Sequence, residues 1–190
     1  GKYYTHVDNA AGASIQASAM VGSLEGDNYG GRAISFGTHV FGNGMEHGVI
    51  TNAGSIVSHA ASSAESANLN PGLASAWGAS IGAYSNVLAG TVVNLGDIEA
   101  AASADFSYAT AYGAFVQTGF DSVISNAGTI HAGATAIEGN AFAVGGHAFA
   151  RHETRTYICT YHTGPYGEYR ECDYANPVIT VDGGESLVEN

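Results

Sequence analysis

The sequence predicts an all-β fold, a parallel β-solenoid (β-helix) of about four to five irregular coils with a projecting, disulfide-stapled hairpin. Three observations carry this prediction. A short motif, Asn-x-Gly-x-Ile, recurs at intervals of 42 and 32 residues. The stretches between the motifs alternate small apolar and polar residues with the period of two that is typical of strands. Near the C-terminal end, two cysteines flank a Gly-Pro-Tyr-Gly turn.

The composition is consistent with a single domain, residues 1–190. Hydrophobic residues make up 45% of the chain, which is enough for one continuous core. Much of this apolar content is alanine, beside 27 glycines, so the core is expected to be shallow and closely stacked. Recurrent valine, isoleucine and aromatic residues argue against disorder. Alanine-rich runs such as 59–65 have helix propensity, which leaves short helices as the alternative to strands.

The charge balance excludes several classes of partner. The net charge is −12 and only five residues are lysine or arginine, which disfavours binding to nucleic acid or to an anionic membrane surface. No apolar run approaches the roughly 18–20 residues that span a bilayer, so the protein is expected not to be membrane-spanning. No segment has the features of a signal peptide, so we expect that any such peptide has been removed or that the chain is an excised segment.

The motif occurs at residues 7–17, 50–56, 92–98 and 124–130, with one extra residue in the first copy. Its asparagine and glycine predict a corner between two strands, because both residues tolerate left-handed backbone conformations. Asparagines of successive coils are expected to stack in a hydrogen-bonded ladder. The isoleucine after each glycine, with Ile15 in the first copy, is expected in the core. The predicted corner and core residues are Asn52, Gly54, Ile56, Asn94, Gly96, Ile98, Asn126, Gly128 and Ile130.

A second landmark, a large residue followed by Gly-Ala or Gly-Gly, follows the last three motifs, at 77–79, 112–114 and 144–146. It lies 17 residues after the motif glycine in two repeats and 24 residues after it in the other. The additional residues fall near 64–72, which contains proline and glycine and predicts a loop insertion. Stacked coils permit length changes that are confined to one turn-rich place.

Residues 91–104, 109–114 and 121–130 resemble the Asn-Ser-Gly-Thr-Ile-type repeats in the passenger regions of bacterial autotransporter-like surface proteins. The resemblance covers residues 7–150. It implies a parallel β-helix that is secreted across an outer membrane and that commonly serves adhesion or surface structure. Nothing in the chain resembles that family's membrane-anchored translocator, which leaves the secretion route open, and residues 151–176 lie outside the repeat pattern.

Residues 151–176 predict a hairpin insertion that projects from the solenoid. Mirror pairing around the turn at 164–167 places Cys159 opposite Cys172, so we expect a disulfide between them. Pro165 cannot adopt a positive φ, which favours a longer loop built on a type I turn. The disulfide would stabilise the fold by about 3 kcal/mol and indicates an oxidising compartment. Two free thiols in a cytosolic protein are the alternative.

The hairpin region is also rich in tyrosine, with five within 18 residues. Exposed tyrosines are frequent in recognition surfaces, and the alternative is that they pack on the flank of the solenoid as a local core. Together with residues near both ends of the chain, they form the candidate assembly or binding set. This set is Tyr3, Tyr4, Tyr157, Tyr161, Tyr166, Tyr169, Tyr174, Val178, Ile179 and Val181.

Residues 177–190 are interpreted as an incomplete terminal coil, because residues 177–184 repeat the strand and corner of residues 48–54. Both ends of so short a solenoid are expected to expose unpaired strand edges, which favour strand addition from a neighbour. We therefore expect a head-to-tail homo-oligomer, or a longer repetitive chain in which the same junction is covalent.

Neither a catalytic site nor a cofactor or metal site is predicted. The eight histidines show no zinc-ligand spacing, although His147 and His152 lie close together where the hairpin begins. Enzymes on β-helices use clustered carboxylates, often with calcium and a basic residue. The best carboxylate set is Asp97, Glu99 and Asp105, which Asp121 of the next coil could join, with no lysine or arginine near it in sequence.

These observations favour an extracellular structural or adhesive protein of a bacterial cell surface, self-assembling into a filament or array. Host or surface glycans are a further expected partner. The alternative, from another class, is a carbohydrate-active enzyme or carbohydrate-binding module on the same scaffold. The lack of a combined carboxylate and cation cluster in the sequence favours the structural function.

Overall fold

The computed structural model describes residues 3–22, 32–42, 45–63, 73–82, 87–105, 108–156, 159–164, 167–172, 178–183 and 185–190, with the backbone alone for residues 87 and 151–183. All regular elements in these ranges are strands. Among them, no helix is long and apolar enough to cross a membrane. The predicted all-β class is confirmed.

The strands form three stacked sheets and one hairpin. Sheet A contains β1 (Tyr4–Asn9), β4 (Met45–Asn52), β7 (Val87–Asn94), β10 (Asp121–Asn126) and β16 (Glu185–Glu189). Sheet B contains β2 (Ser14–Gly22), β5 (Ser55–Ser63), β8 (Asp97–Ala104) and β11 (Thr129–Ala136). Sheet C contains β3 (Arg32–Val40), β6 (Leu73–Ile81), β9 (Tyr108–Thr118), β12 (Asn140–Thr156) and β15 (Val178–Gly183). The hairpin pairs β13 (Cys159–Gly164) with β14 (Gly167–Cys172).

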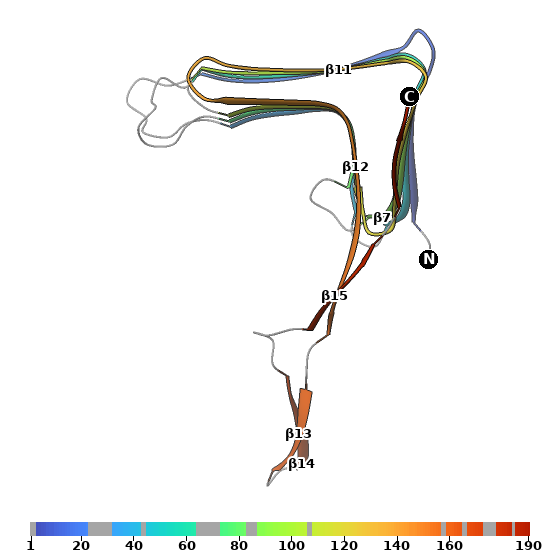
Figure 1. Cartoon of the computed structure of the whole chain (residues 1–190), viewed down its shortest axis with the longest axis vertical. Coiled ribbons are helices and arrows are strands. Elements are labelled where there is room, and N and C mark those ends of the chain that lie inside the picture. The colour runs from blue at the N-terminus through green and yellow to red at the C-terminus, as the bar shows by residue number, and fades with distance from the viewer. Residues whose placement is uncertain are drawn as a thin grey trace.

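Each sequence repeat forms one coil of three strands, one from each sheet, and strands of successive coils pair in parallel. Four coils follow one another, and β16 adds a fifth strand to sheet A. Viewed along the stack, each coil has the outline of an L, because the sheet C strands bend partway along their length (Figure 1). One limb lies between sheet B and the first part of sheet C, and the other lies between sheet A and the later part.

The motif glycines lie at the outer corner of the L, between sheets A and B, but not for the reason that the sequence suggested. The left-handed conformations predicted for Gly54, Gly96 and Gly128 are wrong, since positive φ occurs among the described glycines only at Gly12 and Gly82. Instead, the corners stack so closely that a Cβ at Gly96 or Gly128 would collide with the backbone oxygen of the corner glycine one coil earlier. Close stacking of backbones requires glycine here.

Isoleucines fill the space inside this corner. Ile15, Ile56, Ile98 and Ile130 pair in register along sheet B, and Ile56 and Ile98 are fully buried. The second landmark lies opposite them, at the bend of sheet C. A Cβ on Gly78 would collide with the Ile98 side chain, and equivalent collisions face Gly37 and Gly113. The bend of sheet C therefore needs a glycine wherever an isoleucine of sheet B fills the corner.

The two limbs have cores of different side chains. The core of the alanine limb consists of small residues from sheets B and C: Ala33, Ala60, Ala74, Ala76, Ala100, Ala102, Ala104, Ala109 and Ala111. The core of the aliphatic limb, including the corner, consists mainly of larger residues: Val40, Met45, Ile50, Ile56, Ala79, Ile81, Val92, Ile98, Ala114, Val116 and Ile124. The limbs differ because β-strand alternation places alanine inward in one and branched residues inward in the other.

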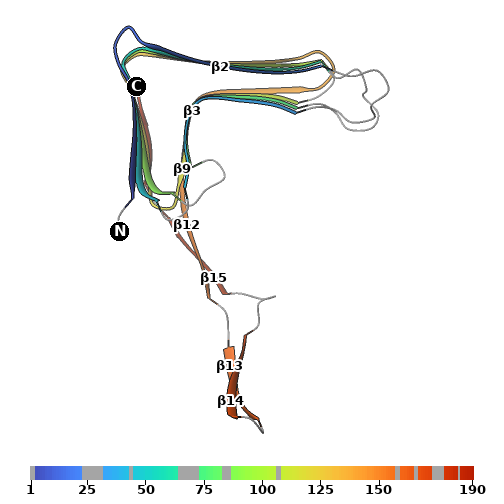
Figure 2. The same ribbon diagram turned by 180° about the vertical axis from the view of Figure 1, so that it is seen from behind.

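A projecting segment, residues 151–183, leaves the body at the end of the fourth coil. β12 continues past Ala150 and pairs antiparallel with β15, and the β13–β14 hairpin lies beyond this base (Figures 1 and 2). In the third coil the chain passes from Thr118 to Asp121 through two residues. The fourth coil has the segment at this place, because Ala150 pairs with Thr118 and Glu185 with Asp121.

The interpretation of residues 178–183 as a strand and corner of the solenoid is wrong. Residues 178–183 form β15, which pairs antiparallel with β12, and the fifth strand of sheet A is β16 instead. The alignment with residues 48–54 would put Val181 at the ladder position of Asn52, and valine has no amide to continue the ladder. In β16, Ser186 accepts a hydrogen bond from the backbone N–H of Ala150 (2.8 Å), which holds the strand beside sheet C.

Candidate functional site

The asparagine ladder runs the whole length of the body. Asn9 Nδ2 donates to Asn52 Oδ1 (2.7 Å), Asn52 Nδ2 to Asn94 Oδ1 (2.7 Å), and Asn94 Nδ2 to Asn126 Oδ1 (2.7 Å). Asn126 Nδ2 then donates to Asn190 Oδ1 (2.6 Å). All four bonds have the same direction. The ladder therefore has an acceptor, Asn9 Oδ1, at one end and a donor, Asn190 Nδ2, at the other.

The ladder also ties each corner to the next coil. Asn9 and Asn52 each donate a second bond to a backbone oxygen just beyond the next corner, that of Ser55 or Asp97, at 3.0 Å. Asn52 and Asn94 are fully buried, so these bonds satisfy amides that would otherwise destabilise the fold. Asn9 and Asn190 were not predicted as members of the ladder. The signal for Asn190 in the sequence is the similarity of residues 185–190 to residues 121–126, and the structure pairs these two segments in that register.

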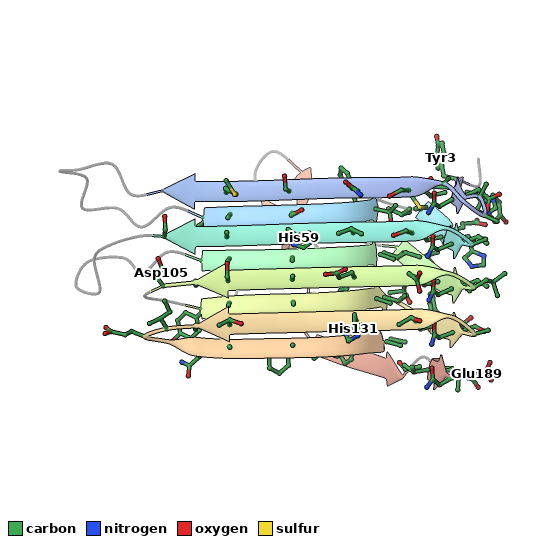
Figure 3. All side chains as sticks on the ribbon, turned by 90° about the horizontal axis from the view of Figure 1, so that it is seen from above. Tyr3, His59, Asp105, His131 and Glu189 are labelled. Carbon is green, nitrogen blue, oxygen red and sulfur yellow. The ribbon has the colours of Figure 1, made fainter. Side chains whose placement is uncertain are left out.

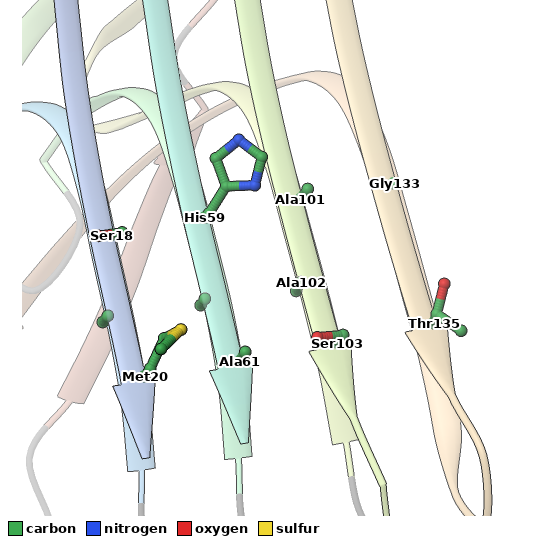
Figure 4. Close-up of a pocket in the computed structure, with 11 residues that line it drawn as sticks. Ser18, Met20, His59, Ala61, Ala101, Ala102, Ser103, Gly133 and Thr135 are labelled. Carbon is green, nitrogen blue, oxygen red and sulfur yellow. The ribbon is translucent and has the colours of Figure 1, made fainter. Parts of the chain in front are cut away.

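The outer face of sheet B is formed by β2, β5, β8 and β11 (Figure 3). Its four strands lie side by side, and an open trough of about 400 Å³ crosses them. Outward-facing small residues line much of this trough, including Ser18, Ala61, Ala101, Ser103 and Gly133 (Figure 4). The trough has no large side chain on β8 or β11, because these strands place Ala101, Ser103, Gly133 and Thr135 there.

Charged groups are few at the trough. His59 Nε2 lies 4.0 Å from Glu99 Oε1, and both side chains are about half exposed. His131 pairs in register with Glu99 on the next strand. In the part of the chain that the structure describes, no three histidine, cysteine or carboxylate side chains are close enough to hold a metal ion. The carboxylates Asp97, Glu99 and Asp105 all belong to or follow β8 and are spread along it, with Asp97 paired to Ser55 and Thr129.

A column of aromatic rings covers the outer side of the sheet C bend. Trp77 stacks between Phe36 and Tyr112, with ring centroids 5.7 and 4.6 Å apart. Phe115 stacks on His147 at 5.2 Å with an interplanar angle of 11°. These pairs lie on successive coils, so the rings present their faces to one another. Stacking on a sugar ring needs a free ring face, and most faces in this column are occupied.

His39 lies in the same column, 4.5 Å from the ring of Phe36 and 5.2 Å from that of Phe41. Burial lowers the pKa of His39 below 6.5, and an interaction with the backbone of Ser80 opposes this shift only in part. Nδ1 of His39 and Oγ of Ser80 are both buried without a hydrogen-bond partner among the described residues. Ser80 Oγ is completely buried, which removes it from any substrate.

Those candidate assembly residues whose backbone the structure describes lie in separate places. Tyr3 and Tyr4 are exposed at β1, and Tyr4 Oη donates to Glu46 Oε2 (3.2 Å). Val178, Ile179 and Val181 lie on β15 in the projecting segment, away from β1. Tyr161 and Tyr169 lie on the hairpin strands β13 and β14. The other candidates, Tyr157, Tyr166 and Tyr174, lie outside the described residues.

The hairpin register agrees with the mirror pairing expected from the sequence. Cys159 lies opposite Cys172, and Tyr161 lies opposite Arg170. The side chains of these residues are outside the described part of the structure, so the disulfide stays a prediction.

Comparison with known proteins adds no identification. No protein-family model, no curated protein and no solved structure matches this chain.

Proposed function

We propose that the chain is a structural, adhesive part of an extracellular surface protein, a β-solenoid rod that extends head to tail. The directional asparagine ladder carries this proposal. Asn9 Oδ1 and Asn190 Nδ2 have no hydrogen-bond partner among the described residues, and they are complementary to each other. A second copy placed on the end of the first would continue the ladder with a bond of the same kind.

The strand edges at the two ends support the same proposal. Among the described strands, β1, β2 and β3 have no paired neighbour on one side of the stack, and β11 and β16 have none on the other. Unpaired parallel strands recruit further strands through backbone hydrogen bonds. A heterologous contact of this type generates an open chain of subunits. In a longer polypeptide the same junction is covalent, and the rod is then a segment of one chain.

The extracellular location rests on chemistry as well as on the resemblance to passenger repeats. A Cys159–Cys172 disulfide is favoured by the register of β13 and β14, because directly opposed residues have the short Cβ separation that a disulfide needs. An isolated two-stranded hairpin is marginally stable in water, so a disulfide between its strands would stabilise it. Intact-mass measurement with and without reductant tests this, and two alkylatable thiols in the native protein would contradict it.

The carbohydrate-binding alternative receives less support from the geometry. Its best candidate surface is the aromatic column, where rings such as Trp77 and Phe115 are nearly buried and stack on other rings. This arrangement stabilises the stack of coils, in the manner of the asparagine ladder. Glycans remain proposed partners of the exposed tyrosines, Tyr3 and Tyr4, rather than of this column.

Asn190→Asp tests head-to-tail extension most directly. The aspartate keeps an oxygen for the bond from Asn126 but removes the open donor and places a carboxylate opposite Asn9 Oδ1 of the next copy. We expect the wild-type protein to form end-to-end rods in negative-stain microscopy and sedimentation velocity, and the variant to shorten them. Gln117→Glu, an equal change of charge at an exposed position of sheet C, is the control.

Two results would overturn head-to-tail assembly. One is a wild-type protein that stays monomeric at the highest soluble concentration. The other is an Asn190→Asp variant that assembles as the wild type does.

A further inference from the structure

The outer face of sheet B has two dissimilar halves at the trough. Met20 and His59, the bulky residues, lie on β2 and β5 (Figure 4). Small residues lie at the matching positions of β8 and β11, where Ala101 and Gly133 continue the row of His59 and Ser103 continues the row of Met20. In the rows of His59 and Met20, the face therefore carries protrusions on one half and space on the other, whereas in the neighbouring row Glu99 and His131 fill the second half.

The two most exposed large apolar side chains of the described residues lie at opposite edges of this face. Met20, on β2, is 82% exposed, and Ile137, directly after β11, is 73% exposed. Met20 and Thr135 occupy the same row, about 14 Å apart across three strand spacings. A methionine on one edge and an isoleucine with a threonine methyl group on the other are complementary apolar surfaces, but they cannot meet within one molecule.

We propose that the outer face of sheet B docks on the same face of a second copy of this chain, related by a two-fold axis parallel to the strands. Such an axis places β2 of each copy over β11 of the other, and β5 over β8. Met20 of one copy then lies against Gly133, Thr135 and Ile137 of the other, and His59 lies over the space at Ala101. Both contacts occur twice, which is the property of an isologous interface.

Charge favours this face over other surfaces for self-association. The chain has a net charge of −12, so two copies repel each other in general. The outward positions of sheet B carry only two carboxylates, Asp97 and Glu99, so this face adds few acidic groups to a contact between two copies. Because the remaining repulsion is long-range, salt screens it and should strengthen the association.

The area of the face determines how strong the contact is. Four strands of about eight residues cover about 500 Å² per copy, or about 1,000 Å² in total. This total is at the lower limit of specific interfaces, so an isolated pair associates weakly. The packing itself has a precedent inside the molecule, where alanine faces of sheets B and C pack directly on each other. The proposal does not depend on head-to-tail extension, since it uses a lateral face and not the ends of the stack.

Ser103→Arg tests the proposal by filling the trough with a charged side chain. We expect at least an approximately tenfold weaker association in sedimentation equilibrium at moderate salt, because a charge would be buried without a partner. Ser125→Arg is the matched control, since it makes the same exchange at an outward position of β10 in sheet A. Circular dichroism and thermal unfolding of both variants check that the fold is intact.

Photocrosslinking identifies the surface independently of any loss of folding. p-Benzoylphenylalanine in place of Met20 is expected to give a covalent dimer whose crosslinks map to residues 133–137. The same crosslinks should persist in the Asn190→Asp background, which separates this proposal from head-to-tail extension. Crosslinks confined to β1 or β16, equal association of the Ser103→Arg and Ser125→Arg variants, or a wild-type monomer at all salt concentrations would overturn it.

Discussion

The alanine limb and the aliphatic limb are made by the same coils, yet they solve the packing problem in opposite ways. In the aliphatic limb, Ile50, Ile81, Val92, Val116 and Ile124 are fully buried and fill a wide space between sheets A and C. In the alanine limb, the facing side chains are methyl groups and serine hydroxyls, such as Ser58 Oγ donating to Ser35 Oγ at 2.9 Å. The core of the aliphatic limb is stable because large side chains fill it, whereas the core of the alanine limb needs small side chains so that its two sheets can approach closely. Substitutions that enlarge or reduce side chains should therefore affect the limbs differently.

The largest effect is expected where the limbs meet. Ile98→Asp would bury a carboxylate in the fully closed corner, opposite Gly78, without a cation to pair with it. We expect a loss of more than about 4 kcal/mol in the free energy of unfolding, measured by denaturant titration. Ile98→Val, which removes one methyl group, should lose only about 0.5–1.5 kcal/mol. Similar stability of the aspartate and valine variants would show that the corner is not closed.

A cavity should be costly in the aliphatic limb. Ile124→Ala removes a fully buried side chain from the space between sheets A and C, and we expect a loss of about 2–5 kcal/mol. Val123→Ala, the neighbouring outward position of β10, is the control and should change stability much less. A small effect at Ile124 would mean that the limb can collapse around the cavity, contrary to the comparison.

In the alanine limb the opposite change is harmful. Ala102→Leu adds a hydrophobic group to a core where methyl groups of two sheets already face each other, and we expect a loss of about 1–3 kcal/mol from overpacking. Glu99→Leu, on the outer side of the same strand, should stay within about 0.5 kcal/mol of the wild type. Stabilisation by leucine at position 102 would show that the limb has room to spare.

The smallest expected effect depends on pH and is confined to the bend of sheet C. Because burial lowers the pKa of His39 in the folded state, the unfolded chain binds more protons as the pH falls below 6.5. Stability conferred by the neutral ring is therefore present above this pH and is lost as the pH falls toward the lower folded-state pKa. His39→Phe should reduce the fall in melting temperature between neutral and mildly acidic buffer. An unchanged pH dependence would contradict this assignment.

The residues that mark corners were predictable from the sequence, whereas the shape of the coil was not. The asparagine and isoleucine positions repeat with the coil, so an alignment of repeats places Asn52 with Asn94 and Ile56 with Ile98. The L shape depends on the bend at Gly37, Gly78 and Gly113, and a lone glycine in a strand does not by itself specify a bend. The trough could not be predicted, because it arises from small outward side chains on adjacent strands, and the pairing of these strands is not visible in the sequence.

The terminal strand shows a different limit of sequence reasoning. Residues 178–183 and 185–189 are both short segments that mix apolar and polar residues, and alternation alone cannot assign one of them to sheet A. The decisive difference is Asn190, whose amide oxygen receives the bond from Asn126. Hydrogen bonding between coils, which the local sequence pattern does not show, therefore determines which segment joins sheet A.

The projecting segment has a consequence for chain entropy. Asn94 and Asn126 are 32 residues apart, whereas Asn126 and Asn190 are 64 residues apart, so the last rung closes a loop twice as long. Doubling a flexible loop adds only about 0.6 kcal/mol of closure entropy. The chain can avoid this additional entropy cost, because the antiparallel base of the projecting segment holds Arg151 opposite Gly183. If this base forms before β16 docks, the flexible chain between Asn126 and Asn190 is as short as that between Asn94 and Asn126. The order of folding therefore determines how readily β16 joins sheet A.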